Sequence, residues 1–141
     1  MGVSKGSAQW EGGLKTGKGS MKPGHVADVP FSFGSRFEGQ PASNPEELIG
    51  AALAGCFSMA LTASLEKAGL KPGSVRTSAD VKLELVGGGF SITGIELTSE
   101  ATVSGVDDAK FQEIALDTKK NCPVSKALAA TPIALKATLK G

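Results

Sequence analysis

The sequence predicts an α+β protein with the element order βββ-α-ββ-α-α-β, built as one domain over residues 1–141. Three observations support this prediction: several short segments alternate apolar and polar residues, one long segment of small apolar residues begins with helix-capping residues, and the strands come in runs. Runs of strands form antiparallel sheets with the helices kept to one side. A chain of 141 residues is long enough for one hydrophobic core.

The first three strands are expected before the central helix. Residues 7–21 resemble a hairpin that turns at Gly12-Gly13, because two glycines supply the positive φ angles of a tight turn. The segment FSFGSRFEG then predicts a third, extended strand. On such a strand the three phenylalanines share one face and Arg36 lies on the other.

The central helix has clear start and stop signals. Asn44 is the expected N-cap, Pro45 occupies the first helical position, and Glu47 is placed to close a capping box. The helix is expected to run to about Lys67, with Gly69 as its C-terminal stop.

The remaining elements follow from periodicity and turn residues. A half-buried strand over 79–86 turns at 87–89 into a strand over 90–103, whose alternation changes phase around Thr93-Gly94 and predicts a bulge. Asp107 or Ser104 caps a second helix through Lys120, a short third helix starts at the Cys122-Pro123 step, and the last strand covers 132–139.

Composition excludes several classes of function. The formal net charge of +1 and pI near 7.7 argue against nucleic acid as a partner. Two cysteines and one histidine are too few ligands to suggest a metal site. No secretory signal is evident, so a cytoplasmic protein with reduced thiols is expected. The charge-free stretch 48–65 is half small or hydroxyl residues, which favours a buried core helix over a membrane span.

The central helix has no consistent polar face, so it must be covered on all sides. Two short helices in one chain scarcely do this, and we therefore expect a homodimer with this helix at or near the interface. Glu47 and Cys56 are nine residues apart, which corresponds to ~900° of rotation and ~13 Å of rise. They cannot touch within one helix, so a site that uses both needs a second subunit or a third residue.

The cysteines admit two interpretations from the residues alone. Cys56 is compatible with plain packing, whereas Cys122 starts a helix, where backbone N–H groups favour a thiolate. Arg36 lies among phenylalanines, and its guanidinium is suited to hold a thiolate and a peroxide oxygen together, with Glu47 orienting it. A cysteine hydrolase would need His25 as its base, and His25 sits in a Pro/Gly loop without a suitable partner.

Four segments together resemble a known family. QWEGGLKTGKG, FSFGSRFEG, NPEELIGAALAGCFSMAL and NCPVSKAL are similar, in order and spacing, to the signature segments of the OsmC/Ohr family of hydroperoxide reductases. The arginine in SRFEG indicates the OsmC branch. The resemblance implies an intertwined homodimer with two active sites at its interface. Its implied site residues are a peroxidatic Cys56, a resolving Cys122, Arg36 and Glu47.

The resemblance also implies the reaction. Organic hydroperoxides, and less efficiently hydrogen peroxide, would be reduced through a Cys56 sulfenic acid and a Cys56–Cys122 disulfide, without metal, flavin or other cofactor. A dithiol, such as a lipoylated protein, would then recycle the enzyme, which would serve in oxidative and osmotic stress defence. Nearby apolar side chains, Phe57 and Met59 with the three phenylalanines of FSFGSRFEG, would favour organic substrates. The alternative hypothesis is a non-catalytic dimeric binding module whose cysteines only pack.

Overall fold

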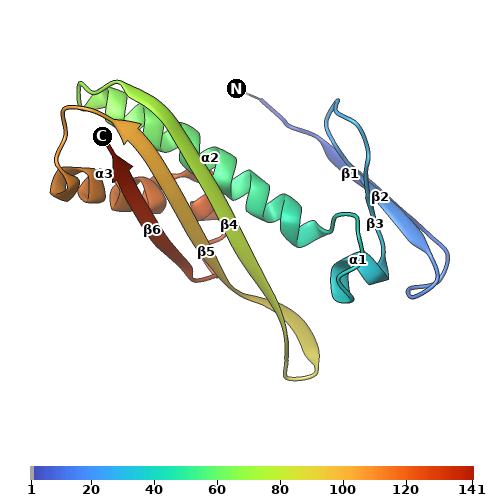
Figure 1. Cartoon of the computed structure of the whole chain (residues 1–141). Helices are drawn as coiled ribbons and strands as arrows, with labels where there is room; N and C mark the ends of the chain where they lie inside the picture. Colours follow the sequence, from blue (N-terminus) through green and yellow to red (C-terminus); the bar gives the residue numbers. More distant parts are fainter. Residues whose placement is uncertain (1) are drawn as a thin grey trace. The chain divides into compact units, whose positions relative to one another are not determined.

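The structure is a computed structural model that describes residues 2–141 (Figure 1). The chain forms two compact units that divide between Leu48 and Ile49, called unit 1 and unit 2 below. Each unit has its own three-stranded sheet. The α+β class predicted from the sequence is confirmed.

Unit 1 contains the sheet β1-β2-β3, with strands Gly6–Glu11, Lys18–Pro23 and Val29–Phe31, all antiparallel. The expected hairpin is present, but its turn is longer than the two glycines suggested. Glu11 pairs with Lys18, so residues 12–17 form the loop. Gly12 has a φ of +92°, which explains a glycine at the first loop position.

The extended strand expected at FSFGSRFEG is wrong. Helix α1 occupies Phe33–Phe37, and the third strand lies upstream. Ser32 and Ser35 form a capping box: the Ser35 N–H donates to Ser32 Oγ over 3.0 Å, and the Ser32 N–H donates to Ser35 Oγ over 2.8 Å. This local hydrogen bonding outweighs the apolar alternation. The element order therefore gains one helix relative to the prediction.

Helix α2 spans Pro45–Lys67 and matches the prediction at both ends. Asn44 Oδ1 accepts a hydrogen bond from the Glu47 N–H over 2.9 Å, as an N-cap does. Gly69 follows the helix with a φ of +84°, the left-handed conformation of a helix stop. The side chain of Glu47 does not close the predicted capping box, since it accepts from Ser43 Oγ over 2.8 Å.

Unit 2 is built on the sheet β4-β5-β6, which begins with the hairpin of β4 (Pro72–Val86) and β5 (Gly89–Val103). Gly87 and Gly88, with φ of +58° and +86°, make the turn that the glycine run predicted. The pairing register shifts between Lys82 and Leu83, which leaves Thr93 as the extra residue. The bulge predicted around Thr93-Gly94 is confirmed.

Strand β6 (Ile133–Lys140) pairs parallel to β5, so the expectation of purely antiparallel sheets is wrong for unit 2. A parallel pair needs a long crossover connection. Helices α3 (Asp108–Asn121) and α4 (Pro123–Ala127) supply it between the two strands. The N-cap of α3 is Asp107, whose side chain accepts from the Lys110 N–H.

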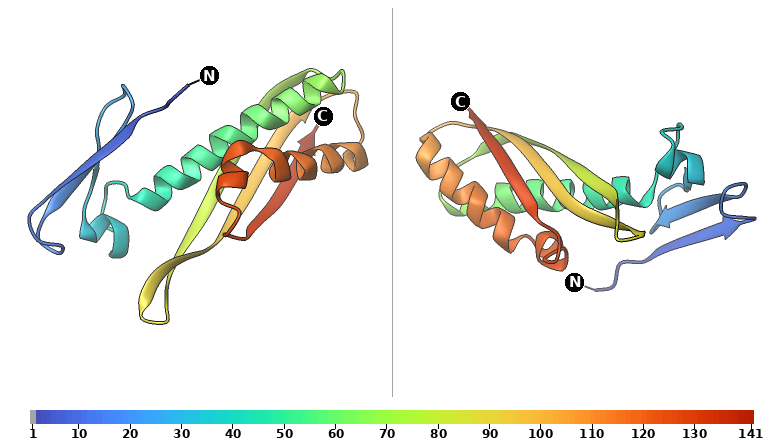
Figure 2. Two further views of the ribbon diagram at one scale, coloured as in Figure 1. Left: turned by 180° about the vertical axis from the view of Figure 1, so that it is seen from behind. Right: turned by 90° about the horizontal axis from the view of Figure 1, so that it is seen from below.

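The core of unit 2 lies on one face of this sheet, which α2 and α3 cover together (Figure 2). Its fully buried members alternate along β5 and recur at helical spacing on α2 and α3. The core side chains are Leu53, Phe57, Leu61, Leu65, Ile95, Leu97, Ala101, Val103, Phe111, Ala115 and Cys122. The other sheet face is polar and includes the Lys82–Glu96 ion pair.

The central helix is buried on one face only within this chain. Its opposite face is apolar but exposed, with Ala52 and Gly55 open to solvent and the Met59 side chain 79% exposed. Helix α2 is long and apolar enough to cross a membrane by length and composition alone. Four of its residues are buried in the core of unit 2, as in a core helix. The expectation of a helix covered on all sides is not met by one chain.

Candidate active site

The two cysteines of the chain meet in unit 2. Cys56 lies midway along α2 and Cys122 at the junction of α3 and α4. A hydrogen bond joins their Sγ atoms over 2.6 Å. Both are free thiols; Cys56 is partly exposed, whereas Cys122 is 1% exposed. The arrangement is a dithiol pair in which one sulfur is open to a reactant and the other is shielded.

Local sequence signals fix Cys122 in this position. Pro123 has no N–H group and cannot continue α3, but it suits the first position of the next helix. Cys122 therefore adopts a non-helical backbone between the two helices, with its N–H donating to the Thr118 carbonyl over 2.9 Å. Thr118 Oγ1 also donates to Ser64 Oγ of α2 over 3.3 Å, which helps hold α3 beside α2.

The two thiols are electrostatically different. Burial and the hydrogen bond with Cys122 raise the pKa of Cys56, opposed in part by the backbone N–H of Val124. Burial alone would also raise the pKa of Cys122, but the hydrogen bond with Cys56 and the Ser125 and Val124 N–H groups bring it below its ordinary value. The backbone N–H groups at the start of α4 thus lower the pKa of Cys122, as its place at a helix start suggested.

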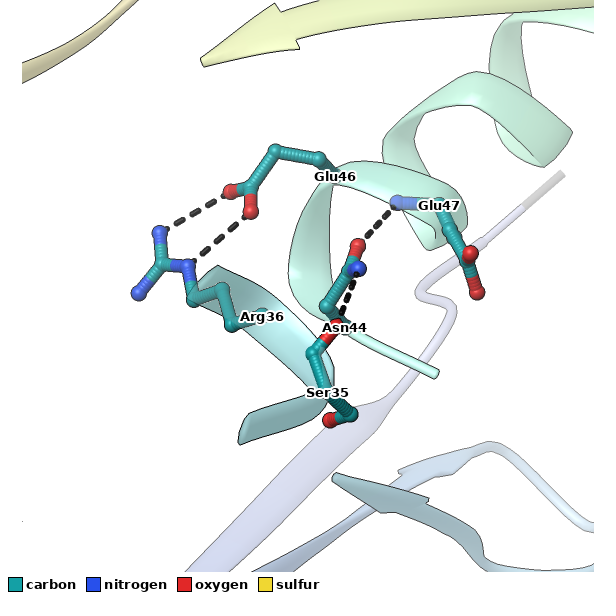
Figure 3. A network of polar contacts seen from close by, with 5 residues as sticks. All are labelled: Ser35, Arg36, Asn44, Glu46 and Glu47. Atoms are coloured by element: carbon teal, nitrogen blue, oxygen red, sulfur yellow. Dashed lines mark hydrogen bonds and ion pairs between the residues drawn. The ribbon is translucent and has the colours of Figure 1, made fainter. Parts of the chain in front are cut away.

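Unit 1 contains the second cluster of candidate residues, around Arg36 in the last turn of α1 (Figure 3). Arg36 Nε and Nη2 each donate to one oxygen of Glu46 over 2.9 Å. The guanidinium also lies over the Phe37 ring, 5.2 Å from its centroid. Glu46 is 7% exposed and the Arg36 side chain 34% exposed, so this is a mostly buried, two-pronged ion pair.

The expectation that Glu47 orients Arg36 is wrong within this chain, because Glu46 holds that position. Consecutive helix residues are ~100° apart, so the two carboxylates face different directions. Figure 3 shows Glu46 pointing to Arg36 and Glu47 pointing away from it. Asn44 ties the start of α2 to α1, since its Nδ2 donates to the Ser35 carbonyl over 3.2 Å. The carboxylate that pairs with Arg36 is thus the neighbour of the one expected from the sequence.

A cavity of about 150 Å³ adjoins Arg36 in unit 1. The lining residues are Trp10, Leu14, Phe31, Ser32, Phe33, Arg36 and Phe37. The Trp10 and Phe31 ring centroids are 5.4 Å apart. Gly19 permits this packing, because a Cβ there would lie 2.6 Å from the Trp10 ring. The cavity is an aromatic pocket with one cation at its wall.

The apolar residues that were expected to favour organic substrates lie in three different environments. The three phenylalanines of FSFGSRFEG line the pocket of unit 1. Phe57 is wholly buried in the core of unit 2, so a direct role at a substrate pocket is wrong for it, while Met59 lies on the exposed face of α2. His25 is exposed in a loop of unit 1. Within residues 2–141 there is no group of three side chains suited to hold a metal ion.

The sequence is similar to proteins of one family. A sequence profile of the family described as OsmC-like protein matches residues 37–137. The chain is 51% identical over 128 residues to Peroxiredoxin OsmC of Escherichia coli (strain K12), covering 89% of this chain and 90% of the relative. It is 34% identical over 90 residues to the organic hydroperoxide resistance protein of Xanthomonas axonopodis pv. citri, covering 63% and 61% of the two chains.

Solved structures share the fold. The organic hydroperoxide resistance protein OhrB of Bacillus subtilis superposes with a TM-score of 0.67 at 26% identity, over 96% of this chain and 98% of the other. The organic hydroperoxide resistance protein of Elizabethkingia anophelis has a TM-score of 0.70 at 26% identity, over 99% and 98% of the two chains.

Proposed function

The chain belongs to the OsmC-like protein family, and on this basis we propose that it reduces organic hydroperoxides to alcohols through Cys56 and Cys122. It is a cysteine-based enzyme of the peroxiredoxin type, and its relatives are named for peroxiredoxin activity and for hydroperoxide resistance. The observation that carries the proposal is the 2.6 Å approach of two free thiols that lie 66 residues apart in sequence.

Cys56 is proposed as the sulfur that attacks the peroxide. Cys122 is 1% exposed, so a hydroperoxide has no direct access to it, whereas Cys56 is partly exposed. Cys122 is already in contact with Cys56, which suits it to resolve an oxidised Cys56 without a large movement.

The proposed cycle has three balanced steps. The Cys56 thiolate attacks the distal oxygen of ROOH, the O–O bond breaks, and the leaving alkoxide takes a proton to give ROH and a Cys56 sulfenic acid. The Cys122 thiolate then attacks the Cys56 sulfur, forming the disulfide and expelling hydroxide, which is protonated to water. An external dithiol reduces the disulfide by thiol exchange and is itself oxidised to a disulfide.

The first step needs a cation near Cys56, because burial and Cys122 raise the pKa of Cys56 within unit 2. A guanidinium keeps its charge in an apolar setting and stabilises a thiolate. We assign this role to Arg36, as the family resemblance implies, with Glu46 instead of Glu47 as the carboxylate that orients it.

Glu46 and Glu47 offer a matched pair of substitutions for this assignment. Glu46→Gln removes the charge that holds Arg36 and is expected to lower kcat/KM for an organic hydroperoxide by about tenfold or more. Glu47→Gln changes the adjacent exposed carboxylate and is expected to stay within about twofold of the parent protein. Steady-state peroxide consumption measures both. Equal losses in the two variants, or loss only in Glu47→Gln, would contradict the role of Glu46.

The aromatic pocket beside Arg36 supports an organic substrate. Its mostly aromatic walls offer apolar surface to an alkyl or aryl group, which hydrogen peroxide does not have. We therefore expect kcat/KM with cumene hydroperoxide to exceed that with hydrogen peroxide by at least about tenfold, with dihydrolipoamide as the reductant in both assays. A higher value for hydrogen peroxide would show that this pocket does not select the substrate.

A homodimer and a dithiol reductant belong to the same proposal. The face of α2 that carries Ala52, Gly55 and Met59 is apolar and open to water in one chain. A second copy of the chain would cover it, as the sequence prediction of a dimer requires. A dithiol suits the recycling step because its second thiol completes the exchange within one molecule.

A further inference from the structure

Ser125 carries a buried hydroxyl that the reaction described above does not use. It lies in the first turn of α4, three residues after Cys122, and is 7% exposed. Within residues 2–141, Ser125 Oγ is the buried side-chain polar atom that has no hydrogen-bond partner. More than 90% of buried polar groups in proteins are partnered, and an exception calls for a physical reason, such as a role in redox chemistry.

The redox group on the same helical turn is Cys122, which is the N-cap of α4 and precedes Ser125 by three residues. Residues three apart on a helical turn lie on the same side, and the Ser125 side chain is one of the groups that lower the pKa of Cys122. The titratable group that faces Cys122 is Cys56 of α2. A hydroxyl is a weak partner for a neutral thiol or a disulfide sulfur, but it donates a charge-assisted hydrogen bond to a thiolate.

The cycle places negative charge on Cys122 at a defined moment. In the disulfide, Cys56 is the sulfur accessible to an external dithiol, because Cys122 is buried. The incoming thiolate forms a bond to the Cys56 sulfur, the Cys56–Cys122 bond breaks, and Cys122 leaves with the electron pair. A leaving thiol with a lower pKa departs faster.

We propose that Ser125 is a positioning residue whose hydroxyl donates a hydrogen bond to the Cys122 thiolate released when the disulfide is reduced. The same bond keeps Cys122 ionised for its attack on the Cys56 sulfenic acid. This inference rests on the proposed peroxidase cycle and adds a residue that favours the reductive half of it.

The test compares Ser125→Ala with Ser125→Thr, which keeps a hydroxyl, and with Ser99→Ala as the control. Ser99 is another buried serine of unit 2, 1% exposed, and it bonds to Thr77 over 3.0 Å and not to a cysteine. Removing an unpartnered hydroxyl from Ser125 should not weaken the fold. The first readout is the rate at which dihydrolipoamide reduces the preformed disulfide.

Ser125→Ala is expected to slow this reduction about three- to tenfold, while Ser125→Thr and Ser99→Ala stay near the parent rate. The rate of Cys56 oxidation by hydroperoxide should not change. The second readout is the pH at which the Cys122 thiolate forms in a Cys56→Ser background, followed by its ultraviolet absorbance. The loss of a donor to the anion raises the pKa, so this midpoint should rise by about half to one pH unit in Ser125→Ala.

The proposal is overturned if Ser125→Ala matches the parent protein in both readouts, if Ser125→Thr is as slow as Ser125→Ala, or if Ser99→Ala is slowed equally. The second readout needs no peroxidase activity. If the parent protein failed to react with hydroperoxides, the proposed peroxidase function would be wrong. The pH midpoint of Cys122 thiolate formation would still show whether Ser125 stabilises the thiolate.

Discussion

Cys56→Ser is expected to abolish hydroperoxide reduction, lowering kcat by at least about a thousandfold. The substitution replaces the attacking sulfur by a hydroxyl, which is far less nucleophilic near neutrality and cannot form a sulfenic acid. Cys122 remains but is 1% exposed, so it should not substitute for the missing sulfur. Steady-state consumption of tert-butyl hydroperoxide with excess dithiol measures the loss.

The control for Cys56→Ser is Ser58→Ala, a change of similar size on the same helix. Ser58 Oγ donates to Thr77 Oγ1 over 2.7 Å and has no place in the proposed reaction. Circular dichroism spectra of both variants check that the helices are retained. Turnover by Cys56→Ser near the parent rate would remove Cys56 from the role of attacking sulfur.

Cys122→Ser is expected to give one stoichiometric turnover and then stop. Cys56 should still attack the peroxide, but the sulfur that lies 2.6 Å away, the proposed partner in the disulfide, is absent. The sulfenic acid should therefore persist long enough to be trapped by dimedone and detected by peptide mass spectrometry. The burst amplitude should equal the concentration of active sites, and continued turnover with dithiol should be at least about a hundredfold slower than in the parent protein.

The assignment of Cys122 as the resolving cysteine has a direct contrary result. If Cys122→Ser cycled at full rate with a dithiol, the external thiol would be reducing the sulfenic acid itself. The close contact of the two sulfurs would then be packing and not part of the cycle.

The fold was predictable where the start and stop signals were local and unopposed. Asn44, Pro45 and Gly69 mark both ends of α2, and the change of alternation near Thr93 marks the bulge. The same reasoning failed where two local signals competed. Apolar alternation in FSFGSRFEG suggested a strand, but the Ser32–Ser35 capping box forms a helix there.

The direction of β6 depends on the path of the α3–α4 crossover, which alternation within the strand does not encode. The sequence nominates candidate site residues by residue type, and their roles stay predictions. A cysteine at a helix start and an arginine among aromatic residues carry recognisable chemistry, and the contact of Cys56 with Cys122 agrees with the pairing that the resemblance implied.

The choice between Glu46 and Glu47 was not predictable, since adjacent carboxylates differ only in the direction they face, and Glu46 of the first turn of α2 is the one that faces Arg36. Ser125 was not predictable either. Its hydroxyl is buried without a hydrogen-bond partner, and this depends on packing that cannot be read from the sequence.

Peptide mass spectrometry of the fully reduced protein, after one equivalent of tert-butyl hydroperoxide, tests most directly whether the two sulfurs form one redox pair. The expected result is the loss of two hydrogens from the intact chain and a Cys56–Cys122 cross-linked peptide that disappears on treatment with a dithiol. A chain that remains unmodified while the peroxide persists would contradict the peroxidase function and favour a binding protein in which the cysteines only pack.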